Sequence, residues 1–163
     1  MEWRTGDMID VCHEVGANGI VFTANSVIKS NGELVMGGGA AKRVRDYFPS
    51  SVPSALAQEI KQNDDRIQPD YYLAGIQFKL KETLEPFYIF ALQVKRDFND
   101  KGDLSLTVES LQLLAEWCNA NPDVKLVLNC PLIGLGGFSD QKEDIKNIVD
   151  GILFNCDVVV TLL

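Results

Sequence analysis

Histidine, paired cysteines and long apolar runs are all scarce in this sequence, and each scarcity argues against a class of function. The 163 residues contain one histidine, His13, and four cysteines without a Cys-x-x-Cys pair: Cys12, Cys118, Cys130 and Cys156. A structural zinc centre needs four Cys or His ligands at short spacings, so we expect no metal and no cofactor. Three of the cysteines lie in apolar-periodic segments, which predicts small buried side chains rather than redox chemistry.

Membrane and nucleic-acid functions are also disfavoured. No apolar run approaches the ~20 residues of a membrane-spanning helix, and the start, Met1–Arg4, lacks the charged-then-apolar pattern of a signal peptide. We therefore expect a cytoplasmic protein, in the host cytoplasm if the chain is of phage origin. Fifteen basic residues face 23 acidic ones, and the net charge of −8 disfavours general nucleic-acid binding. Backbone N–H groups could still hold a small anion.

Short apolar strands alternate with longer amphipathic helices along the chain. The predicted strands are Glu2–Arg4, Gly19–Thr23, Tyr71–Lys79, Phe87–Val94, Lys125–Asn129 and Asp157–Thr161. Near-continuous apolar runs indicate strands that are covered on both faces, as in parallel sheets. Because 163 residues suit one domain, we predict a single α/β domain over residues 1–163. It would have three α/β/α layers and a mixed, mostly parallel sheet of about six strands.

Four helices are predicted from apolar spacing and from their end signals. The first ends before Pro49, the second begins near Pro53, and Asp103 and Ser139 can cap the third and the fourth. The side chains expected to face the core are Ala40, Ala41, Val44 and Tyr47 in the first, Leu56, Ala57 and Ile60 in the second, Leu104, Val108, Leu111, Ala115 and Cys118 in the third, and Ile145, Ile148, Val149 and Ile152 in the fourth.

Two glycine-rich loops follow strands and open helices. One runs from Met36 to Ala41 and contains three consecutive glycines, and the other runs from Cys130 to Phe138. Glycine lets the backbone approach a ligand closely, and a helix N-terminus offers free N–H groups to a phosphate. Either loop alone would be interpreted as a tight turn. Two of them at the carboxyl ends of strands indicate a binding site.

The common nucleotide motifs fit this sequence poorly. Gly32 and Gly37 have P-loop spacing, but Gly38 and Gly39 stand where that motif needs Lys and Ser or Thr. The stretch from Gly37 also lacks the third glycine of a dinucleotide fingerprint, and it lies too far beyond its strand.

The order of the motifs resembles the macrodomain family. The matching segments are Gly6-Asp7-Met8-Ile9, Ala24-Asn25, the glycine triplet followed by Ala40, and Pro131–Phe138. The chain is most similar to the branch that contains ADP-ribose-1″-phosphate phosphatases, ADP-ribosyl glycohydrolases and antitoxins that remove ADP-ribose from DNA. It shares with them a strand that ends in Lys95-Arg96 before a charged loop. The stretch from Asn31 to Gly37 is similar to small phage and bacterial members.

This resemblance implies a role for each matching position. Asp7 would accept a hydrogen bond from the adenine amino group, with Met8 and Ile9 beside the ring. Asn25 and Lys95 would be catalytic, Asn25 by bonding the distal ribose and Lys95 at its C1″ end. The residues implied to line the distal ribose and the nearby phosphate are Gly37, Gly38, Gly39 and Ala40. Those implied to surround the diphosphate are Pro131, Gly134, Leu135, Gly136, Gly137 and Phe138.

Two departures from the family pattern leave the activity open. The first Asn of the family's Asn-Ala-Ala-Asn is here Phe22, and Phe138 replaces an aspartate of the second loop, with Asp140 two residues further on. The leading hypothesis is hydrolysis of ADP-ribose 1″-phosphate. A non-catalytic reader of ADP-ribose or ADP-ribosylated macromolecules is the second, and a glycohydrolase acting on modified protein or nucleic acid is the third. Simpler roles for the same residues are a helix cap for Asp7, a local turn for Asn25 and a solvated charge for Lys95.

Overall fold

The computed structural model describes residues 1–62, 70–130 and 142–162. In this part of the chain six strands form one sheet in the order β1-β6-β5-β2-β4-β3. Their bounds are Glu2–Arg4 (β1), Gly19–Ala24 (β2), Leu73–Lys79 (β3), Pro86–Gln93 (β4), Leu126–Asn129 (β5) and Val158–Thr161 (β6). Neighbouring strands run parallel except β3 and β4, which are antiparallel. The predicted mixed, mostly parallel sheet is confirmed.

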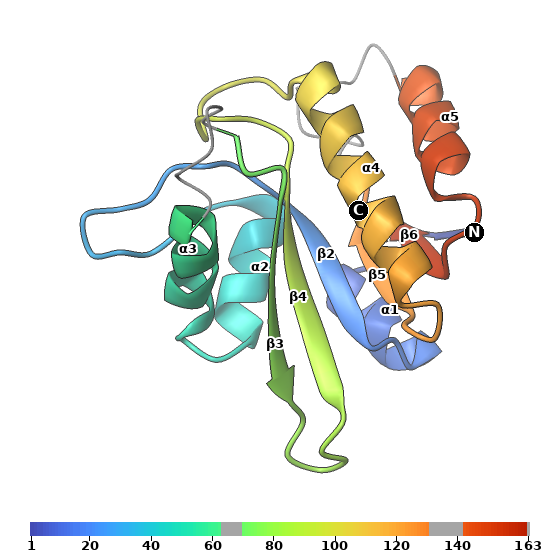
Figure 1. Cartoon of the computed structure of the whole chain (residues 1–163), viewed down its shortest axis with the longest axis horizontal. Helices are drawn as coiled ribbons and strands as arrows, with labels where there is room; N and C mark the ends of the chain where they lie inside the picture. The colour runs from blue at the N-terminus through green and yellow to red at the C-terminus, as the bar shows by residue number, and fades with distance from the viewer. Residues whose placement is uncertain (63–69, 131–141, 163) are drawn as a thin grey trace.

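Five described helices cover the two faces of the sheet (Figure 1). They are α1 (Met8–Val15), α2 (Gly39–Tyr47), α3 (Val52–Gln62), α4 (Leu104–Ala120) and α5 (Lys142–Leu153). Side chains of β2 alternate between the faces, so Phe22 packs with α1, α2 and α3, whereas Val21 packs with α4 and α5. Both are completely buried, and each contributes ~1.5–3 kcal/mol to folding. The predicted three-layer α/β/α fold is confirmed, with β2 at its centre.

The strand predicted from Tyr71 begins two residues later, at Leu73. The backbone N–H groups of Tyr71 and Tyr72 donate instead to Oε1 of Gln93, at 2.9 and 3.0 Å. Tyr72 also has a positive φ of 62°, which is incompatible with a regular strand. The buried side chain of Gln93 therefore delays the start of the strand to Leu73. Apolar periodicity could not have indicated this effect.

The inward face of α4 is rotated from the predicted one. Leu111 and Cys118 are buried as expected, but Leu104, Val108 and Ala115 are only half-buried. The buried positions that the prediction omitted are Leu106, Thr107, Ser110 and Leu114. The hydroxyl groups of Thr107 and Ser110 can be buried because each donates to a backbone carbonyl oxygen.

In α2, Ala41 and Val44 are buried as predicted and Ala40 is half-buried, but Tyr47, which was expected to face the core, is 47% exposed. The remaining helix predictions agree with the structure where it describes them. Helix α2 ends at Tyr47, just before Pro49, and the Asp103 side chain caps α4 by accepting from the N–H of Leu106. In α5 the buried positions are Ile145, Val149 and Leu153, while Ile148 and Ile152 are half-buried. The proposed cap of that helix, Ser139, lies outside the described residues.

All four cysteines are free and buried, as predicted for small core side chains. Burial raises the pKa of Cys12 to about 11 and, together with the neighbouring Cys156, that of Cys118 to about 12. These thiols are therefore protonated and unreactive at neutral pH. Among the described helices, none is both long and apolar enough to cross a membrane.

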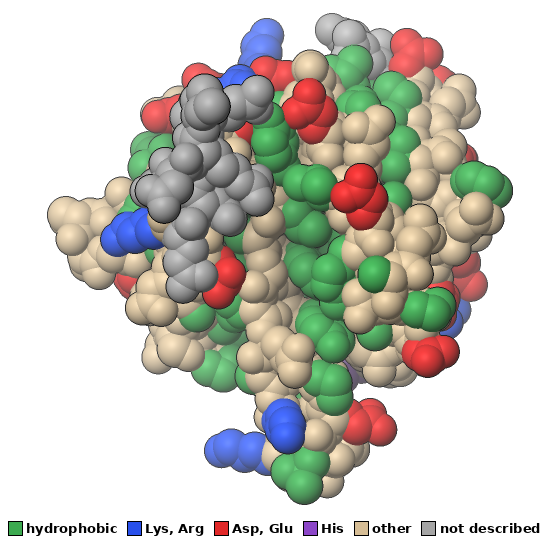
Figure 2. All heavy atoms as spheres, in the orientation of Figure 1, with side chains coloured by type: hydrophobic (Ala, Val, Ile, Leu, Met, Phe, Trp, Pro, Cys, Tyr) green, Lys and Arg blue, Asp and Glu red, His purple; other side chains and the backbone are tan. Residues whose placement is uncertain are grey.

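The β3–β4 hairpin extends beyond the helices that cover the rest of the sheet (Figure 1). On the face shown in Figure 2, hydrophobic side chains gather along the middle, where β4 adjoins α4. Tyr88 of β4 and Trp117 of α4 pack against each other, with their ring centroids 4.9 Å apart. Gly75 of β3 allows the Phe90 ring to lie against the sheet, because a Cβ atom there would come within 2.5 Å of that ring.

Candidate functional site

The first glycine loop leads into the N-terminus of α2 beside the carboxyl end of β2. Gly38 is the N-cap residue and supplies no side-chain cap. Within the described part of the chain, no side chain caps the first N–H groups of α2, and the helix itself supplies no acceptor for them. Gly39 has a positive φ of 56°, which favours glycine, whereas Cβ atoms at Gly37 and Gly38 would meet nothing within 4 Å. The protein's own packing thus does not require glycine at positions 37 and 38, but their open side can admit a ligand.

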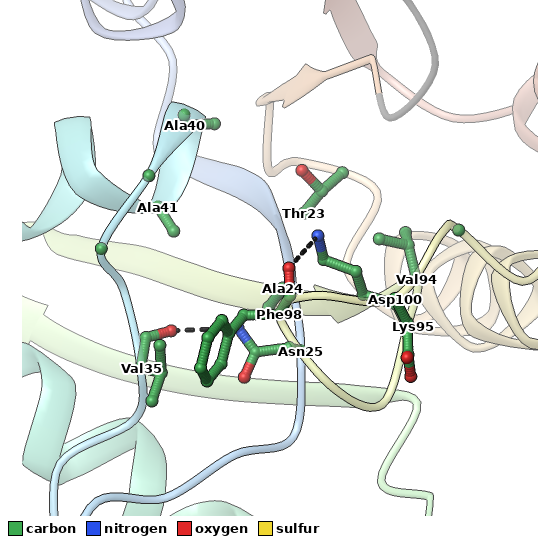
Figure 3. Close-up of a pocket in the computed structure, with 14 residues that line it drawn as sticks. Thr23, Ala24, Asn25, Val35, Ala40, Ala41, Val94, Lys95, Phe98 and Asp100 are labelled. Atoms are coloured by element: carbon green, nitrogen blue, oxygen red, sulfur yellow. Dashed lines mark hydrogen bonds between the residues drawn. The ribbon is translucent and has the colours of Figure 1, made fainter. Parts of the chain in front are cut away.

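A cavity of about 580 Å³ adjoins this helix end, at the carboxyl ends of β2 and β4 (Figure 3). Its lining residues are Thr23, Ala24, Asn25, Val35, Gly37, Gly38, Gly39, Ala40, Ala41, Val94, Lys95, Phe98, Asp100 and Gly102. Its volume lies within the ~300–1,000 Å³ of small-molecule sites. Six of the predicted site residues therefore surround one space: Asn25, Gly37, Gly38, Gly39, Ala40 and Lys95.

The cavity has two walls, one formed by the glycine loop with the start of α2 and the other by the segment that follows β4. Asn25 lies between these walls and is only 6% exposed. Its Oδ1 accepts from the N–H of Val27 at 2.8 Å, and its Nδ2 donates to the carbonyl oxygen of Val35 at 3.1 Å. The local-turn role is therefore present, and the amide also fastens both ends of the 26–35 loop. Nδ2 carries a second hydrogen, so Asn25 can fasten the loop and still donate to a ligand.

The opposite wall is the segment that follows β4. Lys95 reaches along it, and its Nζ donates to the carbonyl oxygen of Phe98 at 3.1 Å (Figure 3). Among the described lining residues Lys95 is the one basic side chain and Asp100 the one acidic side chain. Phe98 also lines the cavity, is 48% exposed, and its ring lies beside Asn25 and Val35 (Figure 3). Neither Phe98 nor Asp100 was predicted as a site residue.

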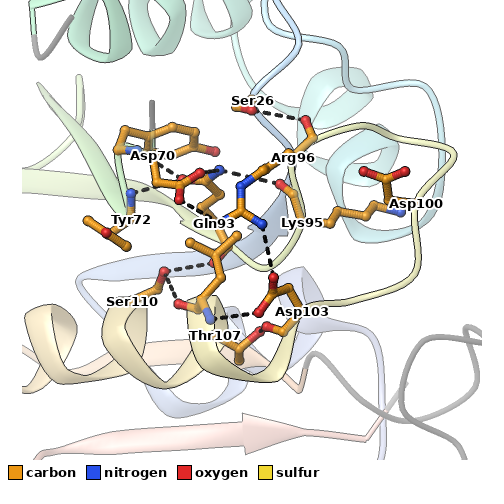
Figure 4. A network of polar contacts seen from close by, with 12 residues as sticks. Ser26, Asp70, Tyr72, Gln93, Lys95, Arg96, Asp100, Asp103, Thr107 and Ser110 are labelled. Atoms are coloured by element: carbon orange, nitrogen blue, oxygen red, sulfur yellow. Dashed lines mark hydrogen bonds and ion pairs between the residues drawn. The ribbon is translucent and has the colours of Figure 1, made fainter. Parts of the chain in front are cut away.

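A buried polar network supports this wall from behind (Figure 4). At its centre, Gln93 is completely buried, and its Nε2 donates to Oδ1 of Asp70 at 3.1 Å. The Ser110 hydroxyl donates to the Gln93 carbonyl oxygen at 2.7 Å, and the Tyr71 hydroxyl donates to that of Asn25 at 2.6 Å. The ends of β2 and β4 are thus fixed to each other and to α4. The sequence analysis missed this network because a glutamine within a strand gives no local signal.

Asp7, Met8 and Ile9 lie at the N-terminus of α1 and are not among the residues that line the cavity. Asp7 caps the helix by accepting from the N–H groups of Ile9 and Asp10, and its second oxygen accepts from Nε of Arg43 at 3.0 Å. Burial would raise the pKa of Asp7, but Arg43 and the two backbone donors outweigh that effect and hold it below its ordinary value. The carboxylate is therefore ionised, and Oδ2 keeps a lone pair for another donor. Met8 and Ile9 are buried.

The second predicted loop lies outside the described residues. This applies to Pro131, Gly134, Leu135, Gly136, Gly137 and Phe138, and also to Asp140. The described chain reaches Cys130, whose N–H donates to the carbonyl oxygen of Thr161 at the carboxyl end of β6. Cys130 therefore lies at the same edge of the sheet as the cavity.

The chain is thus a three-layer α/β/α domain with a cavity at the carboxyl ends of its central strands, where open α/β sheets place their ligand sites. No family profile matches the sequence, and no curated protein matches it either. Solved structures do match. The macrodomain of Thermus aquaticus DarG is 18% identical, with a TM-score of 0.71 over 99% of this chain and 97% of that one. The macrodomain of Mycobacterium tuberculosis DarG is 16% identical, with a TM-score of 0.67 over 99% and 97%.

A third structure is Thermosipho africanus DarTG in complex with ADP-ribose. It is 17% identical and has a TM-score of 0.64, and the match covers 90% of this chain and 38% of that one. At these identities the likeness concerns the fold. The chain has the macrodomain fold.

Proposed function

We propose that the cavity binds ADP-ribose. The observation that carries this proposal is the placement of Asn25 and the N-terminus of α2 around one space in a macrodomain fold. The free N–H groups of the helix suit a phosphate, and the amide of Asn25 suits a ribose hydroxyl. The complex of Thermosipho africanus DarTG with ADP-ribose supports this choice of ligand. Asp7, with an ionised carboxylate, remains the proposed acceptor for the adenine amino group.

Direct titration tests this proposal. We expect calorimetry to give a micromolar dissociation constant, equivalent to about −8 kcal/mol. ADP-ribose should also raise the melting temperature, because it binds the folded state. The absence of both heat and thermal shift at millimolar ligand would refute the proposal.

We further propose that the site hydrolyses the bond at the C1″ end of the distal ribose. In the leading form the substrate is ADP-ribose 1″-phosphate, which reacts with water to give ADP-ribose and inorganic phosphate. Fixing the ribose against Asn25 and Gly38 would orient the 1″ group toward a held water. Backbone N–H groups would then stabilise the charge that develops on the transferring group. Lys95 on the facing wall would attract the terminal phosphate.

The wall around Lys95 gives a specific reason to keep the glycohydrolase as a second candidate. The carboxylate of Asp100 lines the same wall and would repel a doubly charged phosphate. The exposed ring of Phe98 offers a flat surface to a nucleobase or another planar leaving group. In that reaction the amine of Lys95, near C1″, would act as a base or would trap the opened sugar.

One experiment separates the candidate activities. Wild type, Lys95→Ala and the matched control Lys101→Ala are each incubated with ADP-ribose 1″-phosphate, ADP-ribosylated protein and ADP-ribosylated DNA. Lys101 is exposed in the same loop and does not line the cavity. Phosphate and free ADP-ribose are measured separately.

A phosphatase would release phosphate, with only a modest loss in Lys95→Ala and an almost unchanged affinity for ADP-ribose. A glycohydrolase would release ADP-ribose alone and lose that activity in Lys95→Ala. If the wild type releases neither product yet binds ADP-ribose, the protein is a reader.

A further inference from the structure

Arg96 follows Lys95 in the chain, and its side chain points away from that of Lys95 (Figure 4). It does not line the cavity. Its guanidinium group bridges two carboxylates, with Nη2 2.7 Å from Oδ2 of Asp70 and Nη1 2.9 Å from Oδ2 of Asp103 (Figure 4). The bridge joins three parts of the chain: the approach to β3, the end of β4 and the start of α4.

Each carboxylate of this bridge is itself held by its second oxygen. Oδ1 of Asp70 accepts from Gln93, and the Asp70 side chain is only 8% exposed. Oδ1 of Asp103 accepts from the N–H of Leu106 as the cap of α4. Arg96 therefore contacts two acceptors that the fold has already fixed. A planar guanidinium reaches both with separate N–H groups in a fixed geometry, which the compact ammonium of a lysine does not reproduce.

The backbone around Lys95 is fastened on both sides. The carbonyl oxygen of Arg96 accepts from the N–H and the hydroxyl of Ser26, at 3.0 and 2.9 Å. The carbonyl oxygen of Val94 accepts from the N–H of Asp103 at 2.8 Å. Between these fixed points, residues 97–102 form a closed turn in which the N–H of Asp97 donates to the carboxylate of Asp100 at 3.2 Å.

We infer that Arg96 is a positioning residue that holds Lys95, and the 97–102 loop with Phe98 and Asp100, against the cavity. The catalytic part of this inference rests on the proposed hydrolysis, whereas the ordering of the loop does not. The Arg96 side chain is half exposed, so the bridge adds little to global stability. Its effect is geometric, because a misplacement of about 1 Å can cost about 100-fold in rate.

The test compares Arg96→Gln, Arg96→Lys and Asp103→Asn with the wild type. Asparagine at position 103 keeps a capping oxygen for α4 but loses the charge that pairs with Arg96. Arg45→Gln is the matched control, since Arg45 is a partly exposed arginine of α2 that pairs with Asp46 at 3.1 Å and does not line the cavity. The measurements are amide hydrogen exchange in the 97–102 loop, pH-dependent labelling of the Lys95 amine, ADP-ribose affinity, and separate kcat and KM.

We expect loop exchange in Arg96→Gln to be about tenfold faster, because both charge-assisted contacts of Arg96 are lost from a half-exposed position where each contributes little. The labelling profile of Lys95 should shift, and kcat should fall at least about tenfold while KM and ADP-ribose affinity change little. Arg96→Lys should recover part of kcat, Asp103→Asn should lose less than Arg96→Gln, and Arg45→Gln should match the wild type.

Unchanged loop exchange and labelling in Arg96→Gln would overturn the inference. Parallel losses of kcat, affinity and melting temperature would also overturn it, because the bridge would then support the whole fold. If the wild type binds no ADP-ribose and hydrolyses nothing, the proposed function fails. In that case loop exchange and Lys95 labelling alone decide the positioning role.

Discussion

Replacing Asn25 by alanine removes two hydrogen bonds from a nearly buried position, and its cost can be worked out from the structure. The lost contacts are those to the N–H of Val27 and to the carbonyl oxygen of Val35. At ~0.5–1.5 kcal/mol each, their removal destabilises the fold by ~1–3 kcal/mol. For a domain of this size, a loss of ~2 kcal/mol lowers the melting temperature by about 4–8 °C.

The same substitution should weaken ADP-ribose binding by at least about tenfold, because a hydrogen bond to the ribose is lost as well. Release of the 26–35 loop adds to this loss, since that loop leads directly into the glycine triplet. Scanning calorimetry measures the first effect, and isothermal titration at a temperature well below unfolding measures the second.

Asn31→Ala is the matched control for Asn25→Ala. Asn31 makes an analogous pair of contacts, both to Glu33, but in the exposed part of the same loop. Its loss should change stability by less than ~0.5 kcal/mol and leave affinity unchanged. If Asn25→Ala melts within about 1 °C of the wild type, the two hydrogen bonds do not fasten the loop and this argument is wrong. If it is destabilised but binds normally, Asn25 is only a turn residue.

Three further predictions concern the glycines and the acid response. Gly38→Glu should abolish ADP-ribose binding and leave the circular dichroism spectrum native, because its Cβ meets nothing within 4 Å; unchanged affinity would mean that the triplet is only a turn. Gly75→Ala should destabilise the fold by ~1–3 kcal/mol in urea unfolding, because the new Cβ would come within 2.5 Å of the buried Phe90 ring; an unchanged midpoint would contradict this. Backbone N–H groups at the start of α4, and then Arg96, hold the pKa of Asp103 below its ordinary 3.8. The contribution of Asp103 to stability is therefore complete above pH 3.8 and is lost as the pH falls below that value. Melting curves should show a smaller acid-induced loss of stability in Asp103→Asn than in the wild type, and equal losses would refute the assignment.

The fold could be predicted because local patterns and tertiary structure agree along most of the chain. The β2 residues Ile20 and Phe22 face one layer and Val21 the other, so a continuous apolar run correctly indicated a strand covered on both faces. Asp103 combined a capping side chain with the apolar turns that follow it. In such segments the neighbouring residues largely determine which strand or helix forms.

The inaccurate predictions concern polar residues that are buried by distant partners. Ser110 belongs to the inward face of α4 because its hydroxyl reaches the end of β4. Gln93 sets the start of β3 by accepting from the N–H groups of Tyr71 and Tyr72, which precede it. Each contact depends on an element remote in sequence, so no local period could show it. Phe98 was missed for a related reason, since its position in the cavity depends on a turn fixed by Arg96.

The two walls of the cavity come from parts of the chain that lie far apart in the sequence, one before the β3–β4 hairpin and one after it. Asn25 and Lys95 meet because β2 pairs with β4, with Ala24 opposite Gln93, so a fragment that lacks either strand cannot form the cavity. A chain cut at the exposed Leu84 would divide the two walls between two polypeptides while leaving every lining residue intact. Recovery of ADP-ribose binding on mixing the halves would therefore report the pairing of β2 with β4, so that ligand binding would measure the assembly of the domain.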